Sequence, residues 1–230
     1  YFYLKGMMLI KENKYEEAIE SYKKSIDLNN QESFYEYGKI LLKGKGTLIN
    51  KEKGIEYLKE SAERGSIHGM YKYGKLLIKG EEISKDEYKG QEYIKKAADL
   101  GDAKSLYYYS TLIEQNNEQS NEYLKSSAYK GYTEAMYQYA LKLPNKEQNQ
   151  VESTLFFKKA GDKGHIESLY QYALFSINNE NEENKKKAIR FFRIAAINDN
   201  IEAMNRYAVC LYKGFGIETD KEEAIKYLKM

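Results

Sequence analysis

The stretch Gly69-Met70-Tyr71-Lys72-Tyr73-Gly74 decides the fold, because variants of it recur along the whole chain. Each copy consists of a small residue, a large apolar residue, usually a tyrosine, any residue, a second tyrosine and a small residue. The other copies begin at Ser33, Ser105, Ala135, Ser168 and Ala203. Repetition at this spacing is typical of solenoids, in which each supersecondary unit packs on its neighbours. We therefore predict an all-α chain of about seven helix-turn-helix repeats that form an α-α superhelix.

The repeat divides the chain into consecutive units of one continuous array. A first unit covers residues 1–31. The following units are expected at about 32–66, 67–102, 103–132, 133–165, 166–200 and 201–230. Glycine closes the second helix of most units, as at Gly65, whereas Asp199 stands in that position in the sixth. Because the chain begins at Tyr1 and stops inside its last unit, we expect it to be a fragment of a longer protein.

Two regularities indicate how the units pack. The aromatic residue of each second helix and the second tyrosine of the next first helix are 16 residues apart, as from Tyr57 to Tyr73. Because length varies only in the loop inside each unit, we expect a fixed turn between units. Small residues such as Gly38 and Ala173 form a column on each helix, where paired helices should approach closely. Large apolar residues, Leu228 among them, are expected to fill the remaining space.

Three motifs resemble the Sel-one-like repeat (SLR) family, whose members are relatives of the tetratricopeptide repeats. They are the stretch that begins at Gly69, the loops Lys43-Gly44-Lys45-Gly46 and Lys213-Gly214-Phe215-Gly216, and the helix ending from Glu56 to Gly65. Residues 32–230 carry this resemblance, and residues 1–31 resemble a tetratricopeptide unit. The resemblance implies a right-handed solenoid that serves as an adaptor in protein complexes. The fourth, fifth and sixth units lack the Gly-x-Gly loop, so those loops need not follow the family's conformation.

The chemically reactive groups are few, and their surroundings do not predict a catalytic site. His68 and His165 lie in different units without further metal ligands at suitable spacing, so we interpret them as exposed polar residues at helix starts. Cys210 falls in a mostly apolar helix column, which favours a buried structural thiol. The Gly-x-Gly loops follow no predicted strand, which argues against a phosphate loop. We expect no enzymatic activity, metal or cofactor.

A column of tyrosines is the best candidate for a partner-binding surface. Its members are Tyr35, Tyr71, Tyr107, Tyr137 and Tyr170. Tyrosine offers a large, stiff and half-polar contact area. Lys39 and Lys75 each follow a column tyrosine by four residues, which places them on the same helical face. Resemblance to tetratricopeptide arrays implies that this column faces a concave surface; the same position also packs between neighbouring helices, so binding and packing both stay open.

The composition narrows the class of function. The net charge is only +2 and both signs are interspersed, so no basic footprint for nucleic acid is evident. No apolar run approaches the roughly 20 residues of a membrane span, and the single cysteine favours a cytoplasmic setting. We predict a non-catalytic scaffold that binds a peptide or helical segment of a partner protein. The alternatives are a regulatory or spacer segment of a larger signalling enzyme, such as a protein kinase, and an enzyme in its own right.

Overall fold

A computed structural model describes residues 1–114, 117–144, 147–177 and 181–229. The described residues form 14 helices and no strand, and 78% of these residues are helical. We name the first helix of each hairpin the A helix and the second the B helix. The A helices are α1 (Phe2–Lys11), α3 (Gln31–Lys43), α5 (Ile67–Lys79), α7 (Ala103–Leu112), α9 (Thr133–Lys142), α11 (Ile166–Ile177) and α13 (Ile201–Lys213). The B helices are α2 (Tyr15–Asp27), α4 (Lys51–Glu63), α6 (Glu87–Asp99), α8 (Glu118–Tyr129), α10 (Glu147–Asp162), α12 (Glu182–Ile197) and α14 (Lys221–Lys229). The prediction of an all-α chain of helical hairpins is confirmed.

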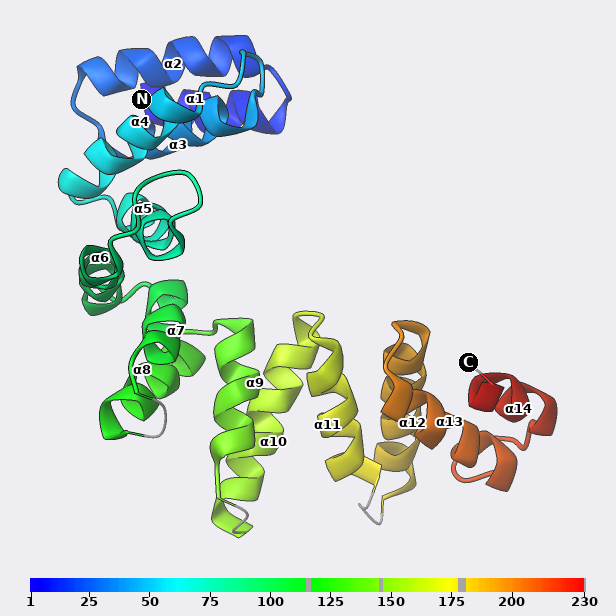
Figure 1. Ribbon diagram of the computed structural model, residues 1–230. Coiled ribbons are helices and arrows are strands. Elements are labelled where there is room, and N and C mark those ends of the chain that lie inside the picture. The colour runs from blue at the N-terminus through cyan, green and yellow to red at the C-terminus, as the bar shows by residue number, and fades with distance from the viewer. Residues whose placement is uncertain (115–116, 145–146, 178–180, 230) are drawn as a thin grey trace. The chain divides into compact units, whose positions relative to one another are not determined.

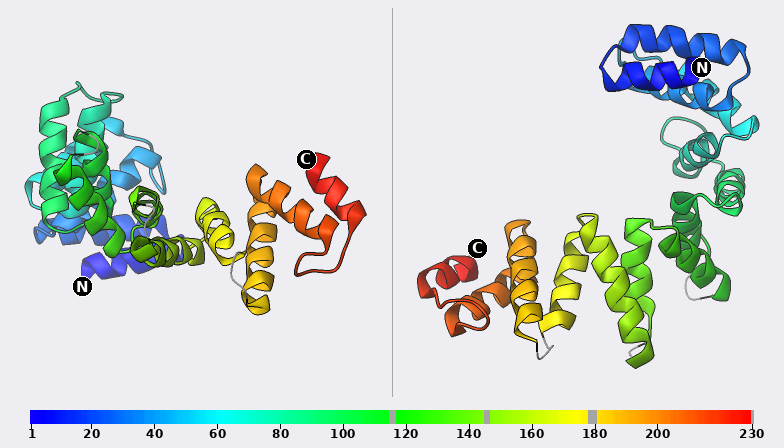
Figure 2. Two further views of the ribbon diagram at one scale, coloured as in Figure 1. Left: turned by 90° about the horizontal axis from the view of Figure 1, so that it is seen from below. Right: turned by 180° about the vertical axis from the view of Figure 1, so that it is seen from behind.

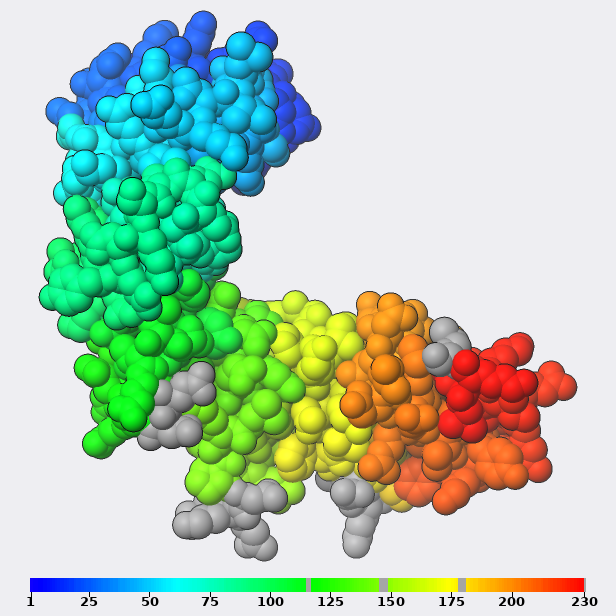
Figure 3. Space-filling model, viewed as in Figure 1, coloured from blue at the N-terminus to red at the C-terminus, as the bar shows by residue number. Residues whose placement is uncertain are grey.

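The chain divides into two compact units, Tyr1–Tyr123 (unit 1) and Leu124–Met230 (unit 2). Within each unit the two helices of a hairpin lie side by side, as α1 and α2 or α9 and α10 do (Figures 1 and 2). B helices also contact the following A helix, as α4 contacts α5 and α12 contacts α13. In the space-filling view, the atoms of neighbouring hairpins within a unit meet directly (Figure 3). Each hairpin therefore buries its apolar surface largely against its neighbours in the chain.

The turn from a B helix to the next A helix is built from backbone and capping hydrogen bonds. After α4, Gly65 adopts a φ of +93°, and the backbone N–H of Ser66 donates to the carbonyl oxygen of Ser61 over 3.0 Å. Ser66 then caps α5, because its Oγ accepts a hydrogen bond from the backbone N–H of Gly69. Asp199 occupies the left-handed position in the sixth hairpin, with a φ of +64°, as the sequence predicts. The equivalent glycines with positive φ are Gly101, Gly131 and Gly164.

The two columns of small residues face each other inside the hairpins. A Cβ atom added to Gly38 on α3 would lie 2.9 Å from the carbonyl oxygen of Gly54 on α4, which leaves no room for a side chain. In the fourth hairpin the Oγ of Ser120 donates to the carbonyl oxygen of Ser110 over 2.9 Å. Small residues therefore let the backbones of paired helices come together, as the sequence predicts.

An edge-to-face aromatic pair joins the two helices of most hairpins. In the third hairpin the rings of Tyr73 and Tyr93 lie 5.4 Å apart at an interplanar angle of 73°. The same arrangement joins Tyr37–Tyr57, Tyr109–Tyr123, Tyr139–Phe156, Tyr172–Phe191 and Tyr207–Tyr227. These contacts lie within single hairpins, whereas the constant spacing of 16 residues links successive hairpins. The spacing thus reflects the fixed turn, and the ring pairs tolerate loops of different length.

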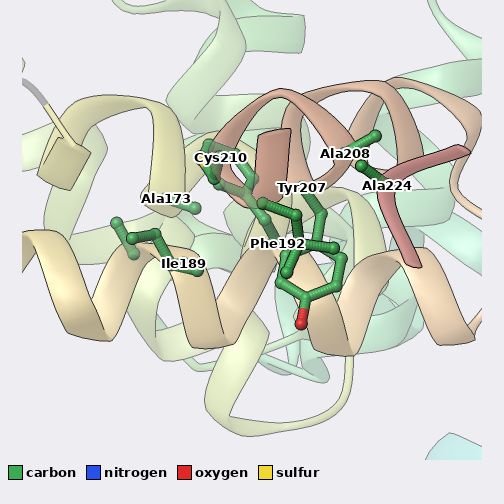
Figure 4. Close-up of a cluster of buried hydrophobic side chains, with 9 residues drawn as sticks. Ala173, Ile189, Phe192, Tyr207, Ala208, Cys210 and Ala224 are labelled. Atoms are coloured by element: carbon green, nitrogen blue, oxygen red, sulfur yellow. The ribbon is translucent and has the colours of Figure 1, made fainter. Parts of the chain in front are cut away.

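The apolar core of unit 2 shows how the later hairpins pack. Ala173, Phe192 and Tyr207 from three successive helices meet in one buried cluster (Figure 4). Cys210 belongs to this cluster as a free thiol, and burial raises the pKa of that thiol. The prediction of a buried structural cysteine is therefore confirmed.

Two expectations about the later units are not confirmed. Leu228 was expected to fill core space, but it is 56% exposed. The loops expected to differ in the fourth, fifth and sixth units include residues 115–116, 145–146 and 178–180, which lie outside the described residues.

Candidate partner-binding site

A cleft of about 320 Å³ on the A helices of unit 1 collects side chains from three successive hairpins. It is lined by residues of α3 and α5 and by the beginning of α7. Its lining residues are Tyr35, Lys39, Lys43, His68, Tyr71, Lys72, Lys75, Asp102 and Lys104. We name this site the lysine cleft. Four residues that the sequence singles out, Tyr35, Lys39, Tyr71 and Lys75, thus lie at one site.

Tyr71 lies among lysines of two helices. The Nζ of Lys104 on α7 lies 4.8 Å from the centre of the Tyr71 ring, and the Nζ of Lys75 lies 5.7 Å from it. The ring also packs edge to face on Tyr108, with the centroids 5.8 Å apart. Attraction between an ammonium group and an aromatic face favours these positions. Tyr71 therefore holds two ammonium groups beside the cleft.

Tyr35 is enclosed by two side chains of the cleft and is itself half-buried. The Nζ of Lys39 lies 4.6 Å from the centre of its ring and forms an ion pair with Glu36 at 2.8 Å. On the next A helix, His68 stacks on the Tyr35 ring at 5.4 Å and an angle of 27°. The Nδ1 of His68 lies 3.0 Å from a carboxylate oxygen of Glu32. Tyr35 therefore lies at a contact that joins α3 to α5.

The charges around His68 favour its protonated form. The hydrogen bond to Glu32 raises the pKa of the His68 imidazole, and the negative charges of Glu32, Asp102 and Glu36 raise it further. Burial lowers this pKa, but the net shift is upward. Burial opposes ionisation of Glu32, but hydrogen bonds from His68 and Ser66 and the nearby positive charges lower the pKa of its carboxyl group. The His68–Glu32 pair is therefore ionic near pH 6, and it stays ionic at lower pH until Glu32 becomes protonated.

Repulsion between lysines affects the titration of Lys75. Burial lowers the pKa of the Lys75 ammonium group, and the positive charges of Lys79, Lys104 and Lys72 lower it further. The negative charge of Glu81 opposes this shift without reversing it. Burial and the neighbouring lysines thus both disfavour the charged form of Lys75.

A second Tyr–His contact occurs in unit 2. The rings of Tyr137 and His165 lie 4.6 Å apart, and the Nε2 of His165 lies 3.3 Å from a carboxylate oxygen of Glu134. The Nδ1 of His165 accepts a hydrogen bond from the backbone N–H of Ser168, so His165 caps α11. Its side chain is only 15% exposed, and the prediction of an exposed His165 is wrong. The exposed side chain predicted for His68 is confirmed, with 62% exposure.

The remaining tyrosines of the column lie outside the lysine cleft. Tyr107 is half-buried on α7, and Tyr170 is half-buried on α11 with its ring 5.9 Å from that of Phe192. All five members of the column are partly exposed, so each can pack on a neighbour and still present one edge to a partner. Packing and binding are therefore compatible at this position.

Sequence reasoning missed three of the lysines that line the cleft, Lys43, Lys72 and Lys104. Lys72 is part of the stretch that decides the fold, but it occupies the position at which that stretch accepts any residue. Lys104 is one residue before the small residue that opens the next copy of the stretch. A signal existed, because lysines accumulate around the column in the second and third units.

No other site with chemical function emerges from the described part of the chain. Among the residues that the structure places, no cluster of histidine, cysteine, aspartate or glutamate could hold a metal ion. Within the same residues, no helix has the length and apolar character required to cross a bilayer. The lysine cleft is therefore the site on which a functional argument can be built.

Comparisons with known proteins place these observations in context. The Sel1 repeat family model matches residues 1–30, 33–66, 67–102, 103–132, 133–165, 167–200 and 201–230. A Sel1 repeat protein from Oxalobacter formigenes superposes with a TM-score of 0.74 at 22% identity, over 99% of this chain and 95% of that one. A protective antigen of uropathogenic Escherichia coli strains with an SLR fold gives a TM-score of 0.75 at 20% identity, over 94% of this chain and 48% of that one. These structural likenesses show the fold, an α-α solenoid.

One curated protein has a local similarity in sequence. Chitin synthase regulatory factor 2 of Schizosaccharomyces pombe is 44% identical over 46 residues, which are 20% of this chain and 9% of that protein. The chain thus spans a small part of that relative, and also about half of the Escherichia coli antigen.

Proposed function

Because the chain belongs to the Sel1 repeat family, whose repeats generally mediate protein–protein interaction, we propose that it is a non-catalytic scaffold that binds a segment of a partner protein on its A helices. The observation that carries the proposal is the lysine cleft, in which tyrosines and lysines of α3, α5 and α7 converge. Half-buried tyrosines lose little side-chain entropy when they bind, which makes them effective contact residues.

The absence of candidate chemistry among the described residues supports a binding role over a catalytic one. The thiol of Cys210 is buried with a raised pKa, so it is held in the less nucleophilic protonated form. The Gly-x-Gly residues Gly44 and Gly214 are left-handed caps that end A helices. Their positive φ values of 65° and 67° explain the glycines without a bound phosphate.

In a direct test, the purified chain is immobilised on beads and incubated with an extract of its source cells. Mass spectrometry then identifies the retained proteins. A retained protein is then produced recombinantly, and its dissociation constant is measured by calorimetry. The double variant Tyr71→Ala/Tyr107→Ala should weaken binding about tenfold or more, because contact tyrosines rank among the energetically important interface residues.

The matched control is Tyr88→Ala/Tyr212→Ala, which removes two tyrosines that are 79% and 54% exposed outside the column. The control should bind with unchanged affinity. Unaltered binding by the Tyr71→Ala/Tyr107→Ala variant would exclude the A-helix face as the binding surface.

The alternative of a regulatory or spacer segment in a larger signalling enzyme, such as a protein kinase, stays a prediction. The sequence of the complete polypeptide tests it, because a kinase domain joined to these repeats would favour regulation within one chain.

A further inference from the structure

The lysine cleft carries more positive charge than its own carboxylates neutralise. Five of its lining residues are lysines, and Asp102 is the one carboxylate among the described lining residues. Asp102 is engaged as the cap of α7, where its Oδ2 accepts hydrogen bonds from the backbone N–H and the Oγ of Ser105 over 2.7 and 2.6 Å. Of the five lysines, only Lys39 forms an ion pair with a described carboxylate, that of Glu36. An entering anion would therefore meet ammonium groups with little competing counter-charge.

This excess is a local feature of the cleft. The whole chain has a net charge of only +2. Some lysines elsewhere in unit 1 form ion pairs, as Lys51 does with Glu82 at 3.0 Å and Lys95 does with Asp99 at 3.3 Å. Overall charge therefore does not explain the cluster. Burial lowers the pKa of Lys75, and repulsion from Lys79, Lys104 and Lys72 lowers it further. A bound anion would relieve this repulsion.

The aromatic rings of the cleft are already in contact with other side chains of the protein. Tyr35 is stacked with His68 and approached by Lys39. Tyr71 is approached by Lys104 and packs on a neighbouring tyrosine. Proteins that bind single-stranded nucleic acid need open aromatic faces on which bases can stack. Here the rings position ammonium groups instead, which favours a ligand recognised by charge.

The distribution of the lysines favours several separate negative charges. Lys43, Lys72 and Lys104 come from three different helices, so successive A helices each contribute a lysine to the cleft. No arginine is found among the described lining residues. Arginine is the residue best suited to bind a single phosphate, because its planar guanidinium group donates paired hydrogen bonds. Lysine is a flexible point charge that can follow carboxylates spaced along a chain.

We propose that the lysine cleft binds an acidic segment of a partner protein, in which successive aspartate and glutamate side chains reach the ammonium groups of α3, α5 and α7. The inference rests on the proposed function and names the chemistry of the partner. The apolar parts of the segment pack against the partly exposed edges of Tyr35 and Tyr71. Charge then governs the rate and specificity of association, and the tyrosines provide contact area.

The test is fluorescence anisotropy with the whole chain and a short fluorescein-labelled peptide of glutamate and aspartate around one phenylalanine. A matched peptide carries glutamine and asparagine at the acidic positions. We expect binding of the acidic peptide alone, with an affinity that falls as salt is added. The variant Lys75→Gln/Lys104→Gln should weaken this binding about tenfold or more, and Lys43→Gln/Lys72→Gln should reproduce the loss.

The control variant Lys53→Gln/Lys89→Gln removes the same charge from exposed positions on α4 and α6 and should bind like the unmodified chain. Circular dichroism melting verifies that all variants are folded. Equal loss in the control variant would mean that net charge alone attracts the peptide, and the inference would fall. It would also fall if the neutral peptide bound equally well or if no peptide bound.

Three further probes separate other occupants. If oligothymidylate bound more tightly than the acidic peptide, the inference would be overturned in favour of nucleic acid. If an otherwise neutral peptide with one phosphoserine bound more tightly than the acidic peptide, the inference would be overturned in favour of a phosphate site. Light scattering that showed dimers lost in Lys75→Gln/Lys104→Gln would assign the cleft to a second copy of this chain. If all peptides fail while the Tyr71→Ala/Tyr107→Ala variant still loses its cellular partner, the proposed function stands without this inference.

Discussion

Asp199 shows that the repeat tolerates a residue other than glycine at the left-handed position of its turn. It holds the left-handed conformation, with a φ of +64°, where four other hairpins have glycine. A side chain in that conformation is strained, because its Cβ lies close to the backbone, although aspartate tolerates it better than most residues. The backbone geometry of the turn is therefore set by the packing of the two helices that flank it.

Asp199→Gly should stabilise the chain by about 0.5–1 kcal/mol, since glycine removes this strain at a modest cost in unfolded-state entropy. Urea denaturation measures the change. The reciprocal variant Gly164→Asp should destabilise the chain by a similar amount, because a Cβ at Gly164 meets nothing within 4 Å and only its φ of +87° opposes a side chain. A neutral result for both variants would contradict the assignment of backbone strain.

Ala173 is the residue at which the closeness of a helix pair can be tested. It is fully buried on α11 and belongs to the same cluster as Ala188 on α12. Ala173→Leu should destabilise the chain by about 1–3 kcal/mol, because the added atoms force the helices apart. Thermal melting measures the loss, with Val209→Leu at a 46% exposed position as the control. If both variants melted like the unmodified chain, the pairing of α11 with α12 through small residues would be refuted.

At the scale of helices, the His68–Glu32 pair links α3 to α5 and should make that contact depend on pH. The pKa of His68 is raised, so its stabilising contribution is complete below the unfolded value near 6.5 and is lost as pH rises through the folded pKa. The pKa of Glu32 is lowered, so its contribution is complete above about 4.5 and is lost as pH falls through the folded pKa. The pair therefore contributes most between about pH 4.5 and 6.5.

We expect the free energy of unfolding to decrease by less than about 1 kcal/mol between pH 6 and pH 8.5, because His68 is largely exposed and solvent screens the pair. Urea titrations at a series of pH values measure this change. Glu32→Gln should flatten the dependence, and Glu16→Gln, an exposed substitution on α2, should leave it intact. A dependence that persisted unchanged in Glu32→Gln would assign it to other groups.

At the scale of the whole chain, stability should be local to groups of neighbouring hairpins. Most contacts between helices join elements that are adjacent in sequence, and α3 with α5 is a longer-range exception. In such an array a weakened hairpin affects its neighbours most. Ala173→Leu should therefore accelerate amide hydrogen exchange in α11 and α12 strongly and leave α1 to α4 nearly unchanged, as mass spectrometry can resolve. Uniform acceleration along the chain would indicate a single cooperative unit.

The fold could be predicted from the sequence because one local pattern was repeated. Each copy constrains the same helix pair, so positions such as Gly38 and Gly54 reinforce one another along the chain. The turn residue Asp199 was also recognisable, because its position in the period is fixed. The ring pair Tyr73–Tyr93 was not, because it depends on how two helices meet across a loop of variable length.

The lysine cleft could be predicted only in part. Tyr35 and Lys39 share a helix, so their proximity follows from helical periodicity. Lys104 approaches Tyr71 from another hairpin, and its contact depends on the side-chain positions of two helices at once. The burial of His165 was not predicted for a similar reason, because it comes from capping α11 and from packing against the tilted ring of Tyr137.

The uniform turn between a B helix and the next A helix has a consequence for how such chains evolve. A hairpin that is duplicated in the gene and inserted between two of these turns would carry the turn sequence that connects it to both neighbours. This sequence already encodes the left-handed residue and the cap of the next helix. The number of hairpins can thus change by whole steps without redesign of those already present. Lengthening or shortening the array then becomes a matter of copying, and new surfaces can be added while older ones keep their shape.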